Sequence, residues 1–114
     1  MGHIVHVDNS DFFRKAMRTF LAELGFEVLE FDRGEDAIAD IAGGGVSCLI
    51  TGLELQDMRG EELIRRIRPA AETMTVIAVT ASGDDARTRN LETLGVAATI
   101  HKGGDWKEKL REYF

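Results

Sequence analysis

Short apolar runs alternate along the chain with stretches whose apolar residues recur every three to four positions. The first pattern predicts β-strands and the second predicts amphipathic helices. The predicted strands are His3–Val7, Phe26–Phe31, Val46–Thr51, Thr75–Thr80 and Ala97–His101. Because strand and helix alternate five times, we expect an α/β fold, with a parallel sheet that carries helices on both faces.

The composition of the individual strands indicates how far each is covered. Cys48–Ile50, Val76–Val79 and Val96–Ala98 are continuously apolar, which is typical of strands covered on both faces. Phe26–Phe31 contains two glutamates, so we expect it nearer an edge of the sheet.

The helical stripes end at residues that commonly stop helices. They run from Phe13 to Leu24, from Ala37 to Ala42, from Leu63 to Ile67, from about Asp84 to Leu94 and from about Trp106 to Tyr113. Glycine follows the first, second and fourth stripes, and Pro69 follows the third. Asp84 or Asp85 is the expected N-cap of the fourth helix.

Composition narrows the class of protein. The 114 residues suit one domain, and the net charge of −6 argues against nucleic-acid binding by this domain. No apolar stretch approaches the ~20 residues of a membrane span, and the chain opens directly into a strand pattern without a signal peptide. The single cysteine, Cys48, cannot form a disulfide framework and is expected to be buried. We therefore expect a cytoplasmic location.

Polar residues follow the inner strands where each strand ends. Asp8 and Asn9 follow the first strand, Gly52 the third, Thr80 ends the fourth and Lys102 follows the fifth. Each of these residues has an ordinary explanation alone, such as a helix N-cap or an exposed lysine. Ligands of open parallel sheets bind at the carboxyl ends of the strands, so the set as a whole predicts a site.

Four stretches around these residues carry a family resemblance. In order they are HIVHVDNSDFFRKAM, CLITGLELQDMRGEELIRRIR, VIAVTAS and GVAATIHKGG. With them the chain resembles, over essentially its whole length, the receiver domain of two-component response regulators. The resemblance implies one domain over residues 1–114 with a three-layer, flavodoxin-like fold, strand order 2-1-3-4-5 and five helices. The last helix ends abruptly at Phe114, from which we expect the domain to come from a longer protein.

The resemblance also implies a chemistry. In that family, two acids after the first strand and one aspartate at the end of the third hold Mg²⁺. That aspartate accepts a phosphoryl group from a histidine kinase, while a lysine and a hydroxyl stabilise the transferred charge. The hydroxyl then shifts, and an aromatic side chain on the fifth strand turns inward with it.

The match to the family's functional residues is partial. Asp8 matches the first acid, Thr80 the switch hydroxyl and Lys102 the lysine. Asn9 stands where the second acid is usual, and Gly52 occupies the position of the phosphoacceptor.

Three further positions depart from the family pattern. Gln56 and Gly103 stand where proline is common, and Thr99 takes the place of the switching aromatic residue. The resemblance therefore predicts a scaffold that is kept and a chemistry that is lost.

A metal site is expected to be weak or absent. The pocket sets Asp8 against Lys102, so its charge is near zero, and Mg²⁺ prefers carboxylate oxygens. Asp8, the Asn9 amide oxygen and Glu54 are the available ligands. His3 and His6 lie three apart on a strand and point to opposite faces, which excludes a shared metal. No other cofactor is expected.

The leading hypothesis is a non-enzymatic pseudo-receiver. It would act by contact with a histidine kinase, another receiver, an output domain or a second copy of itself. The expected contact face is made by the fourth helix, the fifth strand and the fifth helix. Its candidate residues are Arg87, Asn90, Leu91 and Thr99.

Two other functions stay open at this point. One is a working phosphoacceptor receiver that uses Glu54 or Asp57 as a substitute acid, although both are ordinarily explained as solvated loop acids. The other is a small-anion sensor in which Lys102, Thr80 and Asn9 surround the space at Gly52, opposed by Asp8.

Overall fold

The structure is a computed structural model and describes residues 2–114. The strands are β1 His3–Val7, β2 Val28–Phe31, β3 Val46–Thr51, β4 Thr75–Thr80 and β5 Ala98–His101. The helices are α1 Asp11–Glu23, α2 Gly34–Ala42, α3 Gly60–Ile67, α4 Asp85–Thr93 and α5 Trp106–Arg111, and a 3₁₀ turn, η1 Arg68–Ala70, follows α3. None of the helices in this described part is long and apolar enough to cross a bilayer.

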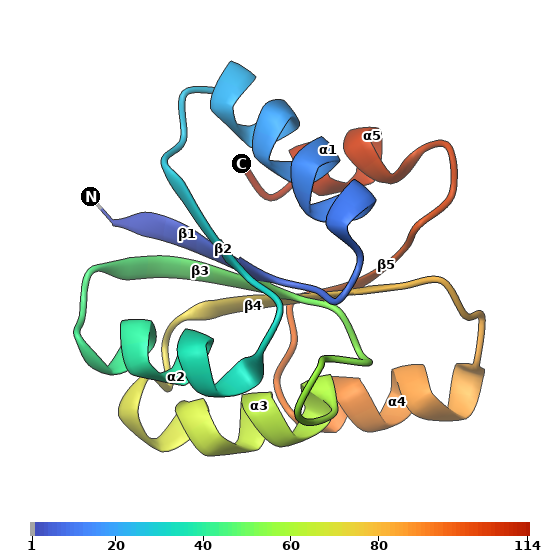
Figure 1. Cartoon of the computed structure of the whole chain (residues 1–114). Coiled ribbons are helices and arrows are strands. Elements are labelled where there is room, and N and C mark those ends of the chain that lie inside the picture. Colours follow the sequence, from blue (N-terminus) through green and yellow to red (C-terminus); the bar gives the residue numbers. More distant parts are fainter. Residues whose placement is uncertain (1) are drawn as a thin grey trace.

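The five strands form one parallel sheet in the order β2-β1-β3-β4-β5. Helices α1 and α5 cover one face, and α2, α3 and α4 cover the other (Figure 1). The expected three-layer α/β fold and its strand order are thus confirmed.

Two strands are shorter than predicted. Phe26 is not in β2, because its N–H bonds to Leu21 O and completes the turn that ends α1. β5 begins at Ala98, and it is an edge strand. The prediction that Val96–Ala98 is covered on both faces is wrong, because Ala97 is exposed. β2 is the other edge, as the two glutamates of the predicted strand indicated.

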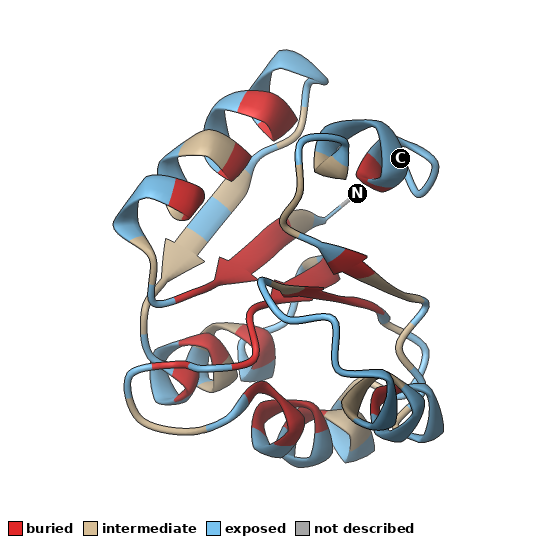
Figure 2. Ribbon diagram, turned by 90° about the vertical axis from the view of Figure 1, so that its right-hand side faces the viewer, coloured by how far each residue is buried: buried red, intermediate tan, exposed pale blue. Residues whose placement is uncertain are grey.

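The helices pack on the sheet through the apolar stripes seen in the sequence. In α1, Phe13, Met17 and Phe20 are buried, and the Ser10 hydroxyl caps the helix by accepting a bond from Phe13 N at 3.1 Å. Figure 2 shows the central strands buried along most of their length. Each sheet face has its own apolar cluster, and Cys48 lies in the cluster under α1 and α5.

Backbone bonds hold the carboxyl ends of neighbouring strands together. Gly52 N donates to Val7 O at 2.8 Å, and Lys102 N donates to Thr80 O at 2.7 Å. After β3 the chain folds back so that Gly60 N bonds to Leu53 O at 2.9 Å. A side chain at position 60 would collide with the Gly52 carbonyl, so this close approach requires glycine. The strand ends and this loop form the rim of one cavity.

Candidate functional site

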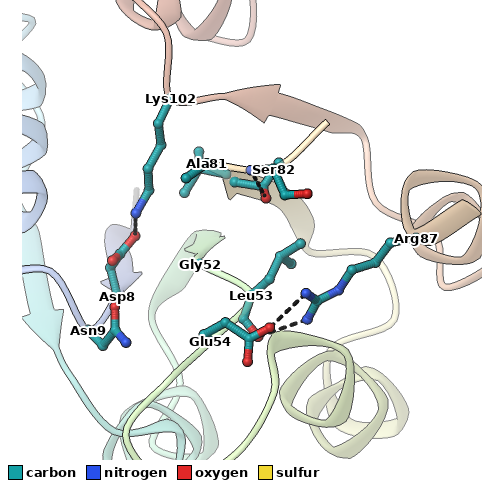
Figure 3. Close-up of a pocket in the computed structure, with 11 residues that line it drawn as sticks. Asp8, Asn9, Gly52, Leu53, Glu54, Ala81, Ser82, Arg87 and Lys102 are labelled. Atoms are coloured by element: carbon teal, nitrogen blue, oxygen red, sulfur yellow. Dashed lines mark hydrogen bonds and ion pairs between the residues drawn. The ribbon is translucent and has the colours of Figure 1, made fainter. Parts of the chain in front are cut away.

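A cavity of about 330 Å³ opens at the carboxyl ends of the strands (Figure 3). It is lined by Asp8, Asn9, Gly52, Leu53, Glu54, Val79, Thr80, Ala81, Ser82, Arg87 and Lys102. The five residues that the sequence placed at the strand ends therefore do come together, while their functional role stays a prediction. Thr99, the expected switch position, does not line the cavity.

Asp8 and Lys102 form an ion pair across this cavity. Asp8 Oδ2 lies 2.8 Å from Lys102 Nζ, and the two side chains are 2% and 20% exposed. Asp8 Oδ1 accepts a bond from Ser10 N at 3.0 Å. The Lys102 ammonium also lies 4.5 Å from the centre of the Phe13 ring, a favourable position for a cation. Both carboxylate oxygens of Asp8 are thus committed within the chain.

Gly52 lies directly beside this ion pair. A Cβ atom at position 52 would lie 2.8 Å from Asp8 Oδ2 and 3.1 Å from Asp8 Cγ. Such distances are too short for an unbonded carbon, so any side chain at position 52 requires Asp8 to move. The Asp8 carboxylate therefore takes up part of the space that an acceptor side chain at 52 would need.

The donor set of this cavity does not fit Mg²⁺. Asp8 is paired with Lys102, and the Glu54 carboxylate is paired with Arg87 at 2.7 Å. Within residues 2–114 there is no group of three His, Cys, Asp or Glu side chains arranged to hold a metal ion. Mg²⁺ binds through carboxylate oxygens, and of the carboxylate oxygens on the described residues that line this cavity only Glu54 Oε2 has no hydrogen-bond or ion-pair partner, on a side chain already paired with Arg87.

Arg87 lines this cavity, which the sequence reasoning did not predict. Its Nε and Nη2 donate to the two oxygens of Glu61 at 2.6 and 2.9 Å, Nη1 donates to Glu54 at 2.7 Å, and Nη2 donates to Leu53 O at 3.1 Å. The bond from Arg87 is the main reason that the pKa of Glu61 is lowered, although its burial opposes this. Arg87 thus ties α4 to the loop after β3 (Figure 3) and, through Glu61, to α3.

Of the predicted contact residues on α4, Leu91 is wrong, while partly buried Arg87 stays a prediction. Leu91 is fully buried, because it packs in the core under α4. Arg87 lies four residues before Leu91 and so lies on the same inward face of α4, where its side chain pairs with Glu61. That spacing was a signal available in the sequence. Asn90 is exposed, as expected of a contact residue.

Asp57 serves a structural role at another helix. Its carboxylate accepts bonds from Gly34 N at 2.7 Å and Glu35 N at 3.0 Å, which caps the N-terminus of α2. Burial raises the pKa of Asp57, but these N–H bonds together with nearby Arg33 hold it below the usual value. The interpretation of Asp57 as a solvated loop acid is wrong, since its side chain is only 12% exposed. Glu54, at 61% exposed, remains accessible.

The two threonines of the predicted switch lie in different surroundings. Thr80 is half-buried at the rim, and its hydroxyl accepts a bond from Ser82 N at 3.0 Å. Thr99 Oγ1 is buried and has no hydrogen-bond partner among the described residues. An unpaired buried hydroxyl is unfavourable, so the Thr99 hydroxyl lowers the stability of the fold.

His6 lies beneath the ion pair. It is fully buried, its Nε2 lies 3.9 Å from Asp8 Oδ2, and its ring lies edge-on to Phe13 at 5.8 Å between centres. Burial lowers the pKa of His6 to about 4, so it is neutral at pH 7. His3 points to the opposite face of the sheet and bonds to Asp40 at 2.6 Å, which confirms that the two histidines do not share a site.

Comparison with known proteins places this geometry in a family. Residues 4–113 match the family model described as the response regulator receiver domain. The chain therefore belongs to the response regulator receiver domain family. It is a receiver module of a two-component signalling system.

Individual relatives are distant. The transcriptional regulatory protein FixJ of Bradyrhizobium diazoefficiens is 24% identical over 83 residues, which cover 73% of this chain and 40% of FixJ. A two-component response regulator from Clostridium difficile superposes with a TM-score of 0.90 at 19% identity, over 99% of this chain and 93% of that chain. A structure described as a CheX-CheY-BeF3-Mg+2 complex from Borrelia burgdorferi gives 0.88 at 19% identity, over 98% and 86%. These structures share the fold, and FixJ is much longer than the aligned region.

Proposed function

We propose that this chain is a pseudo-receiver, a non-enzymatic signalling module that keeps the receiver scaffold without aspartyl phosphorylation. One observation carries the proposal. The Asp8 carboxylate, paired with Lys102 at 2.8 Å, lies where a side chain at position 52 would begin, and position 52 is glycine. The position that should receive a phosphoryl group has no nucleophile, and Lys102 is already neutralised.

Protein contact is the proposed mode of action. The proposed partners are a histidine kinase, another receiver, an output domain or a second copy, bound at the face of α4, β5 and α5. Exposed Asn90 and half-buried Thr99 remain candidates on this face. In the Borrelia burgdorferi complex a CheY is paired with another protein, CheX, which supports protein contact as the mode. A cytoplasmic location is part of the proposal and agrees with a single free thiol, Cys48.

The competing function is a receiver that uses a substitute acceptor. Glu54 supports it, because this acid lines the cavity and its side chain is 61% exposed. Asp57 does not, because its carboxylate caps α2 and does not line the cavity. The ion pair with Arg87 stabilises the ionised carboxylate of Glu54 and so makes it a weaker nucleophile toward a phosphoryl group.

Incubation with acetyl phosphate and Mg²⁺, followed by intact mass measurement, separates the two functions. The pseudo-receiver predicts an unchanged mass. A gain of ~80 Da, the mass of a phosphoryl group replacing a proton, would contradict it. If that gain disappears in Glu54→Gln, the substitute acceptor is Glu54.

The small-anion sensor is the weakest proposal. Both Asp8 and Glu54 line the cavity, and their carboxylates repel an anion that Lys102 and Thr80 would bind. A rise of the melting temperature with phosphate or sulfate beyond a chloride control would revive it.

A further inference from the structure

The groove between α3 and α4 lies on the α2–α4 face of the sheet, next to the proposed contact face. Helix α3 packs closely on α2, whereas α3 and α4 have few close backbone approaches (Figure 1). Two hollows of about 230 and 390 Å³ lie along the space between them and share Arg65. We call these two hollows together the α3–α4 groove.

Two arginine bridges fix the ends of the α3–α4 groove. At one end Arg87 of α4 bonds to Glu61 of α3 through two hydrogen bonds. At the other end Arg68 of η1 donates to Gly95 O, just after α4, at 3.1 Å and to Met74 O at 2.9 Å. Because both bridges join the α3 side to the α4 side, the groove is held open at a set width. A preformed groove reduces the ordering cost of binding.

The lining of the groove changes along its length. The end near Arg87 is polar, with Arg59, Glu62 and Asn90 beside Arg65. The other end is mostly apolar. It is lined by Ile64, Pro69, Leu94 and the exposed Thr93, with Arg65, Arg68 and Glu72 at its edge.

The charges in the groove leave two arginines free. Glu61 is paired with Arg87, and Glu62 lies 3.8 Å from Arg66. Exposed Arg59 and Arg65 have no carboxylate within ion-pair distance anywhere in residues 2–114. Glu72, at the edge of the apolar hollow, also has no ion-pair partner among residues 2–114, but Arg59, Arg65 and the carbonyl-bonded Arg68 outnumber it. The groove is therefore a local positive region in a chain of net charge −6. Arginine next to an apolar hollow is typical of binding hot spots.

We propose that the α3–α4 groove binds a short acidic segment of a partner protein. The segment places carboxylates on Arg59 and Arg65 and an aliphatic side chain in the hollow formed by Ile64, Pro69 and Leu94. The eight residues of α3 span about 12 Å, which an extended segment of about four residues matches. This proposal does not rest on the absence of a phosphoacceptor at Gly52.

A peptide titration tests the proposal. The ¹⁵N-labelled chain is titrated with the capped hexapeptide Asp-Glu-Ser-Leu-Ile-Ser and with its reversed sequence. We expect at least one to bind with submillimolar affinity, to shift the amides of α3 and α4, and to weaken as salt rises. Control peptides with lysine for the acids, or with serine for the aliphatic residues, should bind at least fivefold more weakly.

Variants of the chain sharpen the test. Arg65→Gln and Thr93→Glu should each weaken binding at least fivefold, because one removes a charge and the other adds a repelling one. Arg89→Gln is the matched control, since Arg89 is an exposed arginine on α4 outside the groove, and should bind within twofold of the parent. Circular dichroism confirms that each variant is folded.

Three outcomes would overturn the proposal. They are no binding by either hexapeptide, amide shifts that map away from α3 and α4, or equal losses in Arg65→Gln and Arg89→Gln. Sedimentation of the peptide-free chain adds a fourth. Self-association that Arg65→Gln removes would mean that the groove holds a second copy of this chain instead.

Discussion

Asp8 and Gly52 follow the neighbouring strands β1 and β3, and at this residue scale the position of the Asp8 side chain depends on the absence of a side chain at position 52. Asp8 reaches Lys102 without hindrance because position 52 has no Cβ. Glycine in a strand or at its end costs roughly 0.5–1 kcal/mol relative to alanine. Removing a like charge next to Asp8 offsets part of that cost.

Gly52→Asp should restore a small amount of phosphorylation. The new carboxylate would meet Lys102, but it must displace Asp8, and Asn9 and Thr99 lack the family's side chains. We expect partial labelling by acetyl phosphate and Mg²⁺ in an intact-mass measurement. Gly52→Asn, which has the same shape and no nucleophile, is the control. Complete labelling would show that the rest of the pocket is not degenerate.

His6 should make the stability of the chain depend on pH. Its pKa falls from 6.5 to about 4 on folding because it is buried, with Lys102 and Arg14 adding to the effect and Asp8 opposing it. Between about pH 4 and pH 6.5, His6 binds a proton in the unfolded chain but not in the folded chain. Stability is therefore full above pH 6.5 and is lost as the pH falls toward 4, by about 3 kcal/mol at ~1.4 kcal/mol per pKa unit.

The measurement is urea unfolding at a series of pH values. His6→Leu should lose most of the slope between pH 6.5 and 4, because it removes the titrating ring. His101→Gln, at an exposed position, should keep the slope. Equal slopes in both variants would mean that other groups control the acid side.

At the scale of elements, two polar side chains join parts of the chain that are distant in sequence. Arg87 joins α4 to α3 and to the loop after β3, and Asp57 joins that loop to the start of α2. The loop around the cavity is therefore held by helices on both sides.

Arg87→Gln should destabilise the chain and loosen α4. It removes hydrogen bonds to two carboxylates and leaves Glu61, whose side chain is 9% exposed, without its partner. Hydrogen bonds to charged groups contribute about 1.5–3 kcal/mol, so we expect a loss of about 2 kcal/mol. Urea unfolding measures the loss, and amide exchange should rise in α4. Arg89→Gln is the control, expected within about 0.5 kcal/mol of the parent.

Asp57→Ala should weaken the start of α2. Two N–H groups lose their acceptor, and loss of an N-cap costs about 1 kcal/mol. Thermal or urea unfolding measures the change, and amide exchange should rise at Gly34 and Glu35. Asp36 lies in the same helix turn but accepts no such bond, so Asp36→Ala should change the stability less and is the control. Equal losses would show that the general charge near α2 matters more than the cap.

At the scale of the whole molecule, receiver architecture persists without the donor set that Mg²⁺ needs. The core lies in two clusters on either side of the sheet and involves none of the missing acids. The two apolar clusters therefore form without any of the predicted metal ligands among their residues.

Mg²⁺ should leave the melting temperature unchanged. A ligand stabilises a fold only when its concentration approaches or exceeds its Kd, so we expect ~10 mM MgCl₂ to act no differently from NaCl of equal ionic strength. Scanning calorimetry measures the effect. The double variant Asn9→Asp/Gly52→Asp should gain a Mg²⁺-dependent rise, because it supplies two carboxylates beside Asp8. A clear rise of the melting temperature of the parent chain with MgCl₂ would contradict the conclusion that the donor set does not fit Mg²⁺.

The sequence by itself determined the layers and the residues at the strand ends, because the apolar period and the stop residues are local signals that burial follows. The strand order was predicted only through the family resemblance. β1, β3 and β4 begin and end where the pattern predicted. Only the tertiary structure decided which polar side chains pair. Asp57 reaches α2, Arg87 reaches Glu61 and Asp8 fills the space beside Gly52. Those partners lie 22 to 44 residues apart or depend on a Cβ that is absent, so their contacts follow from three-dimensional packing and leave no periodic trace in the chain.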